Sequence, residues 1–217
     1  MGDYSLQPQH IILAGMTGSG KTTYVLRYLI NDDSAACRFI FDDLNRMWPR
    51  LKIPCCHSPQ ALAASLGTKW SAFNPVLMLP QFGGDMRKAF RWWCRWIFDV
   101  AGRGPGKKMV VVPEVWRHCN PDSIPPELAL LAQAGRELHI ELIADTQRPE
   151  MLNGSITASA TELIVFRQMN PAALRVTENL LRDGGNGYDP AALRSLPLGN
   201  YLAFNRLTGG SVAGKLF

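Results

Sequence analysis

Residues Gly15 to Thr22 read GMTGSGKT and match G-x-x-x-x-G-K-[ST], the pattern of a loop that binds nucleoside triphosphates. Glycines let such a loop wrap the phosphates so that its backbone N–H groups point inward. Lys21 would neutralise the β and γ phosphates, and the Thr22 hydroxyl would bind Mg²⁺. The residues expected to bind ATP are Gly15, Met16, Thr17, Gly18, Ser19, Gly20, Lys21, Thr22 and Thr23.

The placement of this motif decides between function and chance. A pattern this short arises by chance in about one percent of chains of this length. Here IILAG precedes it and reads as a buried strand, while TTYVLRYLI follows it and reads as an amphipathic helix. A strand before and a helix after are the context that a phosphate-binding loop requires, so we expect this loop to bind a nucleotide.

A second chemical motif lies in KKMVVVPEVW, Lys107 to Trp116, which reads as a buried strand that ends in an acid. Glu114 would be the base that polarises the attacking water, as in a Walker B element. The position before it, where Asp normally orders the magnesium shell, is Pro113. A strand that merely ends in a surface glutamate is therefore the alternative.

A third motif, HIELIADTQRP at His139 to Pro149, is another buried strand that ends in polar residues. Gln147 is suited to sense a γ-phosphate or to orient a water molecule, and Asp145 lies close by. In isolation this pattern means little, because loops after strands are polar by default.

Apolar runs that alternate with helical stretches predict an α/β fold, a mostly parallel sheet covered by helices on both faces. The expected strands are His10–Ala14, Arg38–Asp42, Val76–Leu79, Lys108–Val112, His139–Ala144, Glu162–Arg167 and Asn200–Asn205. The expected helices are Lys21–Ile30, Ser58–Leu66, Met86–Val100, Pro126–Leu138 and Pro171–Leu181.

The 217 residues are expected to form one P-loop domain. Within it, 182–217 would hold a turn-rich loop and closing strands. The loop RDGGNGYDP, Arg182 to Pro190, would be a hinge or a lid. The tail SVAGKLF would be either an edge strand or an arm that packs on a neighbouring subunit.

Two basic stretches invite a nucleic-acid interpretation. In Met86–Val100, one expected helical face carries Arg87, Arg91, Arg95 and Asp99, and the other carries Phe90, Trp93, Ile97 and Val100. This spacing favours a helix that packs on the core over a lipid or DNA contact. GRGPGKK precedes a strand and should lie away from the catalytic edge of the sheet. The loop with Trp116, Arg117 and His118 should lie on that edge, where it would contact DNA backbone or a pore, or be a plain polar loop.

The composition is that of a soluble globular protein, with 47% hydrophobic and 19% charged residues and a formal charge of +5 that favours phosphate-rich partners. The N-terminus lacks the features of a secretion signal, and no apolar run approaches the ~20 residues of a membrane span. Five cysteines without a C-x-x-C pair indicate free thiols in a reducing compartment. Zinc held by Cys55, Cys56 and His57 with His118 and Cys119 is the less favoured alternative.

Together, GMTGSGKT, VVVPE and GRELHIELIADTQRP resemble the FtsK/HerA family of hexameric DNA-translocating ATPases, over about His10 to Leu181. The small size is similar to that of genome-packaging ATPases from tailless viruses with double-jelly-roll capsids and an internal membrane. The resemblance implies that Glu114 is the catalytic acid and Gln147 the sensor. Arg136 matches the family's arginine upstream of the sensor strand and is the first candidate for a finger that reaches the neighbouring subunit's nucleotide. Arg148 and Arg175 are weaker candidates.

Because Pro113 departs from the family's Asp, another group must order the magnesium shell. In folds of this class the sensor strand lies between the P-loop strand and the Walker B strand, which would place Asp145 within reach of the metal. We expect Thr22 as the direct ligand and Asp145 in a supporting role. Asp42 or Asp43 is the rival, and an Asp145 that merely caps the following turn is the alternative.

The favoured function is an ATP-driven translocase of double-stranded DNA that packages a viral genome. Its expected partners are DNA, further copies of itself in a ring of five or six subunits, and capsid or vertex proteins. It would be found in the host cytoplasm or at the packaging vertex. One alternative is a P-loop assembly factor that handles protein, like the filamentous-phage morphogenesis proteins. The other is a small-molecule kinase, for which Arg182 beside the glycine-rich loop is the only hint.

Overall fold

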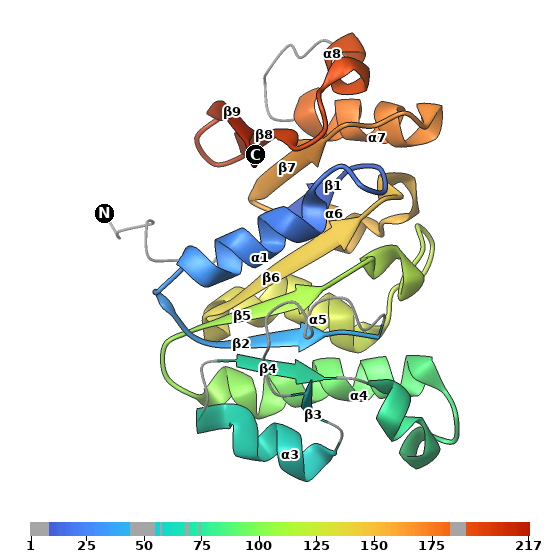
Figure 1. Ribbon diagram of the computed structural model, residues 1–217. Helices are drawn as coiled ribbons and strands as arrows, with labels where there is room; N and C mark the ends of the chain where they lie inside the picture. The colour runs from blue at the N-terminus through green and yellow to red at the C-terminus, as the bar shows by residue number, and fades with distance from the viewer. Residues whose placement is uncertain (1–8, 44–54, 57, 68–69, 74, 183–189) are drawn as a thin grey trace.

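A computed structural model describes residues 9–43, 55–56, 58–73 except 68–69, 75–182 and 190–217. Within them the strands form one sheet of nine, in the order β3-β4-β2-β5-β6-β1-β7-β8-β9 (Figure 1). The strands are β1 (Ile11–Ala14), β2 (Ala35–Phe41), β3 (Cys55–Cys56), β4 (Trp70–Phe73), β5 (Lys107–Val112), β6 (Ile140–Thr146), β7 (Glu162–Phe166), β8 (Asn200–Asn205) and β9 (Ser211–Lys215). The first seven pair in parallel, and β8 and β9 add antiparallel to β7.

Helices cover both faces of the sheet, as the apolar strands require. The α-helices are α1 (Lys21–Asn31), α3 (Pro59–Ala64), α4 (Met86–Asp99), α5 (Pro126–Ala134), α6 (Gly154–Ser159), α7 (Pro171–Arg182) and α8 (Pro190–Ser195). Short 3₁₀ turns are η2 (Ser65–Gly67), η3 (Pro75–Phe82), η4 (Ala101–Arg103), η5 (Val115–Arg117), η6 (Gly135–Leu138) and η7 (Pro149–Met151). Helix α1 crosses one face, and α4, α5 and α6 lie behind the other (Figure 1).

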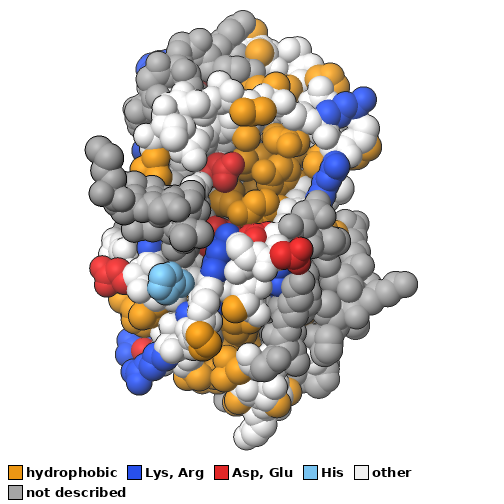
Figure 2. Space-filling model, turned by 90° about the vertical axis from the view of Figure 1, so that its left-hand side faces the viewer, with side chains coloured by type: hydrophobic (Ala, Val, Ile, Leu, Met, Phe, Trp, Pro, Cys, Tyr) orange, Lys and Arg blue, Asp and Glu red, His pale blue; other side chains and the backbone are white. Residues whose placement is uncertain are grey.

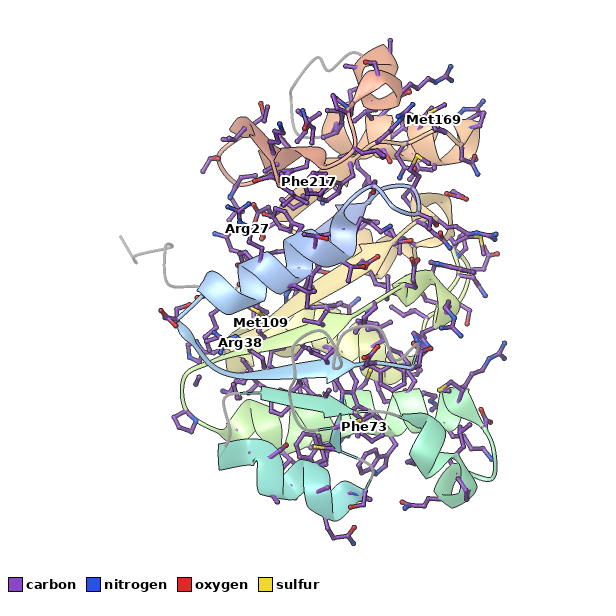
Figure 3. The ribbon with its side chains drawn as sticks, viewed as in Figure 1. Arg27, Arg38, Phe73, Met109, Met169 and Phe217 are labelled. Carbon is purple, nitrogen blue, oxygen red and sulfur yellow. The ribbon has the colours of Figure 1, made fainter. Side chains whose placement is uncertain are left out.

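The central strands are buried on both faces because helices cover both. Every residue of β1 and β6 is buried, which explains why these strands read as continuous runs rather than as an alternation of apolar and polar residues. The larger core cluster lies on the α4 side and is built around Phe41, Phe73 and Trp93. Phe73, labelled in Figure 3, stacks on Trp93. The sheet thus holds its strand ends on a rigid platform.

Helix α4 packs as its spacing predicts. Asp85 caps its N-terminus by accepting hydrogen bonds from the backbone N–H groups of the first turn. Phe90, Trp93 and Ile97 are fully buried, while the arginines at positions 87, 91 and 95 face solvent. Val100, the C-cap of α4, is 42% exposed and does not join the core face as the spacing predicts.

The predicted strand at Val76–Leu79 is wrong. That segment belongs to η3, and the strand beside β2 is Trp70–Phe73 instead. Pro75 and Pro80 frame the apolar run and cannot donate to a strand ladder, whereas the aromatic run before them can form one without such a gap. The pattern of apolar residues alone could not separate the two.

Other sequence expectations are confirmed. The sensor strand β6 lies between the P-loop strand β1 and the Walker B strand β5. The tail SVAGKLF supplies an edge strand, β9. Most of the expected hinge or lid at Arg182–Pro190 lies outside the described residues.

The amino ends of the strands carry a network of buried charge. Lys107, at the start of β5, pairs with Asp32 at 2.8 Å and with Glu141 at 3.0 Å, and Glu141 also accepts a hydrogen bond from Tyr28. Figure 2 shows the side of the molecule from which the central strands start, with hydrophobic side chains gathered in its upper half. GRGPGKK therefore lies at the edge opposite the phosphate loop, as the sequence predicts, and Lys107 there forms ion pairs with Asp32 and Glu141.

Candidate active site

The phosphate loop is tied by its backbone to the strands on either side of it. The Gly15 N–H donates to the carbonyl oxygen of Thr146, at the end of β6. The Met16 N–H donates to the carbonyl oxygen of Arg167, just past the end of β7. These two bonds fix the point where the chain leaves β1 and turns into the loop.

The loop reaches α1 through backbone conformations that favour glycine. Gly18 has φ 77° and Gly20 has φ 116°, in the left-handed region that other residues rarely adopt. Gly20 is also the N-cap of α1, so the turn delivers the positive end of that helix to the loop. This is the geometry in which helix N-termini bind phosphate.

Lys21 lies inside the loop rather than in solvent. Its side chain is 6% exposed, and its Nζ donates to the carbonyl oxygens of Gly15 at 2.8 Å and Met16 at 3.4 Å. The same Nζ is 4.0 Å from Oδ1 of Asp145. The ammonium thus lies within the curve of the loop, beside the Asp145 carboxylate.

Glu114 follows Pro113 in a left-handed conformation, with φ 48° and ψ 49°, which is uncommon for a residue with a side chain. Pro113 has no N–H, so it ends the β5 ladder and the next residue can turn out of the strand. Oε2 of Glu114 accepts hydrogen bonds from the indole N–H of Trp116 at 2.8 Å and from the backbone N–H of Gln147 at 3.2 Å. Such conformations concentrate at functional sites, since the surrounding structure must hold them.

Gln147 links this acid to the phosphate loop. Its backbone N–H contacts Glu114, and its side-chain oxygen accepts a hydrogen bond from the Thr17 hydroxyl in the loop. Arg148 lies over the ring of Trp116, with its guanidinium carbon 4.6 Å from the ring centroid. One connected set of contacts therefore runs from the loop through the sensor segment to the acid at the end of β5.

Asp145 and its rivals occupy different places at this edge of the sheet. Asp145 is buried at the end of β6, level with Leu13 of β1, and lies beside Lys21. Asp43 instead pairs with Arg117 at 2.7 Å, two strands farther from the loop. Of these acids, Asp145 is the one whose contact with the phosphate loop supports a role near the metal.

The candidate arginines are spread over the molecule. Arg136 lies in η6, before the amino end of β6, so the seven residues of that strand separate it from its own phosphate loop. At about 3.3 Å per residue this is roughly 20 Å. Arg175 is exposed on α7. Of the three candidate arginines, Arg148 is the one near Glu114, because it lies over the Trp116 ring and Trp116 donates a hydrogen bond to Glu114.

The structure adds contacts that the motifs do not reveal. Trp116 reaches back to Glu114, and Arg117 pairs with Asp43 from β2. His118 is buried and stacks on Phe90, with ring centroids 4.0 Å apart. Burial, followed by the charge of Arg117, lowers the His118 pKa to about 3.

The zinc alternative gains no support from the part of the chain that is described. Within that part, no group of three or more His, Cys, Asp or Glu side chains is arranged to hold a metal ion. All five cysteines are free thiols. His57 lies outside the described residues.

No protein-family model and no curated protein matches this sequence. Solved structures match its fold over nearly the whole chain. The genome packaging NTPase B204 from Sulfolobus turreted icosahedral virus 2, in complex with AMPPCP, matches with a TM-score of 0.69 at 15% identity, over 96% of this chain and 97% of that one. VirB4 of Thermoanaerobacter pseudethanolicus matches with a TM-score of 0.70 at 12% identity, over 95% and 88%. The chain has the fold of the FtsK/HerA-type P-loop ATPases.

The FtsK/HerA-type fold accounts for the placement of the motifs, since β1, β6 and β5 end side by side and bring the loop, the sensor and the acid together. A third structure, the N-terminal domain of zonular occludens toxin from Neisseria meningitidis, matches with a TM-score of 0.52 at 14% identity, over 97% of this chain and 95% of that one. No helix in the described part of the chain is long and apolar enough to span a membrane.

Proposed function

We propose that this protein is an ATP-driven motor that moves double-stranded DNA, and that it packages a viral genome. It acts as a ring of five or six copies, with each nucleotide at an interface between subunits, and it meets capsid or vertex proteins where DNA enters the virion. The observation that carries the proposal is the contact set joining Thr17, Gln147 and Glu114. It links the phosphate loop to an acid at the end of the neighbouring strand.

The chemistry follows from the positions of these groups. Lys21 neutralises charge on the β and γ phosphates, and the backbone N–H groups of the loop hold their oxygens. The Glu114 carboxylate accepts the proton of the attacking water, and Gln147 orients that water from the sensor segment. The hydrogen bonds from Trp116 and from the Gln147 backbone hold Glu114 in place for this step.

The residues present fit a magnesium ion, whose preferred ligands are hard oxygens. Thr22 follows Lys21 in the first turn of α1, and the Asp145 carboxylate lies 4.0 Å from the Lys21 ammonium. Thr22 would hold the metal directly, and Asp145 would order its water shell. Bound with ATP, Mg²⁺ would neutralise charge that develops on the phosphate oxygens.

A basic pocket beside the catalytic edge supports DNA as the substrate. It has a volume of about 440 Å³ and lies between the start of α4 and the segment after η5. Arg87 and Lys88 line it, together with Arg91, which pairs with Glu127, and Arg117, which pairs with Asp43; the one lining carboxylate among the described residues is Asp85. Cations in this arrangement attract phosphate backbones without reading their sequence.

This pocket is connected to the catalytic acid by one turn of the chain. The Arg117 N–H donates to the carbonyl oxygen of Glu114 at 2.9 Å, which closes η5. Its side chain lines the pocket and pairs with Asp43. A DNA phosphate that draws Arg117 away from Asp43 would therefore also move the turn that holds Glu114. In this way DNA binding would be coupled to ATP hydrolysis.

The proposal is tested by ATP hydrolysis measured with and without double-stranded DNA, together with the mass of the protein in solution. We expect DNA to raise the turnover of an assembled ring, and we expect Lys21→Ala to abolish hydrolysis in both conditions. A protein that stays monomeric and hydrolyses ATP at the same rate with and without DNA would overturn the proposal that it is a translocase.

The pocket has its own test in the salt dependence of DNA binding. Each phosphate contact contributes about one unit to the slope of log K against log salt concentration. Arg87→Gln with Lys88→Gln should reduce that slope by about two. Arg103→Gln, an exposed arginine at the opposite edge of the sheet, is the matched control and should leave the slope unchanged. Equal slopes in the wild type, the double variant and the control would exclude this pocket as the DNA-binding site.

A second candidate is an assembly factor that handles protein, the alternative that the sequence left open. It predicts ATP hydrolysis that duplex DNA does not stimulate. A small-molecule kinase is a third candidate, and it predicts phosphoryl transfer to an acceptor other than water. Arg182 ends α7, and the loop that would form its lid lies outside the described residues.

A further inference from the structure

The chain after β9 returns to the phosphate loop. Two backbone hydrogen bonds make the connection: the Gly199 N–H donates to the carbonyl oxygen of Ser19 at 3.1 Å, and the Leu216 N–H donates to the carbonyl oxygen of Gly199 at 3.0 Å. Arg27 of α1 adds a third bond, from its Nη1 to the Leu216 carbonyl oxygen at 3.1 Å. Residues 216 and 217 are therefore held beside the loop although they follow it by about two hundred positions.

Gly20 and Gly199 have φ of 116° and 81°, which favour glycine, and the side chains at the end of the chain approach both closely. A Cβ on Gly20 would lie 2.8 Å from Cδ1 of Leu216, and a Cβ on Gly199 would lie 2.7 Å from the Phe217 ring. Such distances are shorter than real Cβ atoms tolerate. The Phe217 ring thus lies against the backbone of Gly199, and Figure 3 shows it between the β8–β9 end of the sheet and α1.

The ring nevertheless stays largely in solvent. Phe217 is 68% exposed, and with Thr17, Gly18, Gly20, Lys21, Thr22 and Thr23 it lines a cavity of about 360 Å³. That volume lies at the lower end of the ~300–1,000 Å³ usual for small-molecule sites. Among the described lining residues Phe217 is the one aromatic side chain, and the rest are Gly, Thr and Lys. The cavity therefore has a polar floor suited to phosphates and one flat apolar wall.

We propose that Phe217 is the stacking surface for the nucleobase of the bound triphosphate. This inference rests on the proposed nucleotide site and adds the part of the ligand that the loop itself cannot hold. A nucleotide with its phosphates among the loop N–H groups carries its base beyond the loop, and Phe217 is the wall that the base meets. Stacking on a ring is tolerant of base identity because every base has a π-face. The site thus binds ATP and GTP with similar affinity.

Phe217→Ala is the variant that tests this inference, with binding measured by calorimetry for Mg-ATP, Mg-GTP and inorganic tripolyphosphate. We expect the variant to weaken both nucleotides by about tenfold. Tripolyphosphate, which has no base, should bind the variant and the wild type within twofold. Phe217→Trp should bind both nucleotides at least as tightly as the wild type, since the tryptophan ring is larger than the phenyl ring. Val212→Ala is the matched control, because Val212 is also 68% exposed, lies on β9 and is absent from the cavity wall.

The outcomes separate this inference from the proposed function. Unchanged ATP affinity in Phe217→Ala overturns the stacking role and leaves the phosphate loop standing. Parallel loss of ATP and tripolyphosphate shows that the ring acts by supporting the loop, which also overturns it. A wild-type protein that binds neither ATP nor tripolyphosphate overturns the proposed function, and the inference with it. A selective loss of nucleotide affinity supports both.

Discussion

At the scale of single residues, Glu114 and its two donors determine whether the site can hydrolyse ATP. The carboxylate lies in a left-handed backbone position and is held by an indole N–H and a backbone N–H. Each donor fixes where the carboxylate points. The pair explains how an acid that follows Pro113 at the end of β5 points toward the sensor segment.

Glu114→Gln should keep nucleotide binding and stop turnover, because the amide retains the shape of the side chain and loses the base. General bases contribute about 10²–10⁴-fold, and we expect a loss in that range. ATP affinity and single-turnover hydrolysis provide the two readouts. Hydrolysis at the wild-type rate would show that the acid at the end of β5 is not the base.

Trp116→Phe should lower kcat with little change in KM, because it removes one donor to Glu114 and leaves the phosphate contacts intact. We expect a loss of about tenfold, the size of one hydrogen bond to a charged group. Trp116→Phe in a Glu114→Gln background is the control, and there the second change should have no further effect. Additive losses in the double variant would mean that Trp116 acts through something other than the acid.

Asp145→Asn should weaken the magnesium dependence of ATP binding and slow turnover by ~10–100-fold, as expected for a group that orders the metal's water shell. Asp43→Asn is the comparison, since its carboxylate pairs with Arg117 instead of lying beside Lys21. A magnesium titration of Asp145→Asn that overlays the wild type would show that water alone orders the shell.

At the scale of elements, one buried histidine, His118, makes the packing of the end of η5 on α4 sensitive to pH. His118 lies against Phe90, beside Arg117 and 3.9 Å from Asp43, and burial lowers its pKa to about 3. The unfolded chain binds a proton near pH 6.5 and the folded chain does not, so stability falls as pH drops below about 6.5. His118 therefore has no effect on the free energy of unfolding above about pH 6.5, and it lowers that free energy steadily as the pH falls from 6.5 toward 3.

His118→Phe should remove this dependence, since a phenyl ring can stack on Phe90 without taking up a proton. Between pH 7.5 and pH 5, the wild type should lose about 2 kcal/mol more unfolding free energy than the variant. Urea denaturation at both values measures the difference. His10, whose pKa burial lowers to about 4, is present in both proteins and cancels. Identical losses would mean that His118 titrates normally in the fold.

The elements that carry chemistry are those that the sequence predicts well. β1, β5 and β6 are mostly apolar strands followed by motif residues, and both faces of each are buried, so local pattern and final environment agree. The sequence alone could accordingly place Gln147 and Glu114 at one edge of the sheet. Their direct contact could not, because it depends on how far the backbone turns after Pro113.

What the sequence could not supply are contacts between distant segments. β4 could not be told from Val76–Leu79, since both are short apolar runs and only pairing with β2 separates them. Trp116 reads as a loop residue until its indole meets Glu114. Phe217 reads as the end of an edge strand until the β8–β9 turn returns it to the phosphate loop.

At the scale of the whole molecule, the proposed ring must complete each site with a group from the next subunit. Arg136 lies at the amino edge of the sheet, roughly 20 Å from its own loop along β6. It cannot stabilise its own nucleotide from there. In the ring we propose, this edge faces the neighbour's site.

Arg136→Ala should preserve ATP binding and remove hydrolysis in the assembled state, with a loss of about 10³-fold or more. Mixing it with Glu114→Gln subunits should restore part of the activity, because some interfaces then combine an intact acid with an intact arginine. Arg103→Ala, an exposed arginine on the neighbouring η4, is the control and should remain active. Absence of recovery at every mixing ratio would place the finger elsewhere, with Arg148 and Arg175 as the next candidates.

The central claim, that hydrolysis moves duplex DNA, is tested most directly by displacement of a triplex-forming strand from a linear duplex. We predict displacement that requires ATP, slows as the distance to the triplex grows, and is absent with AMPPCP or in Glu114→Gln. A protein that hydrolyses ATP in the presence of the duplex yet never displaces the third strand would contradict the account.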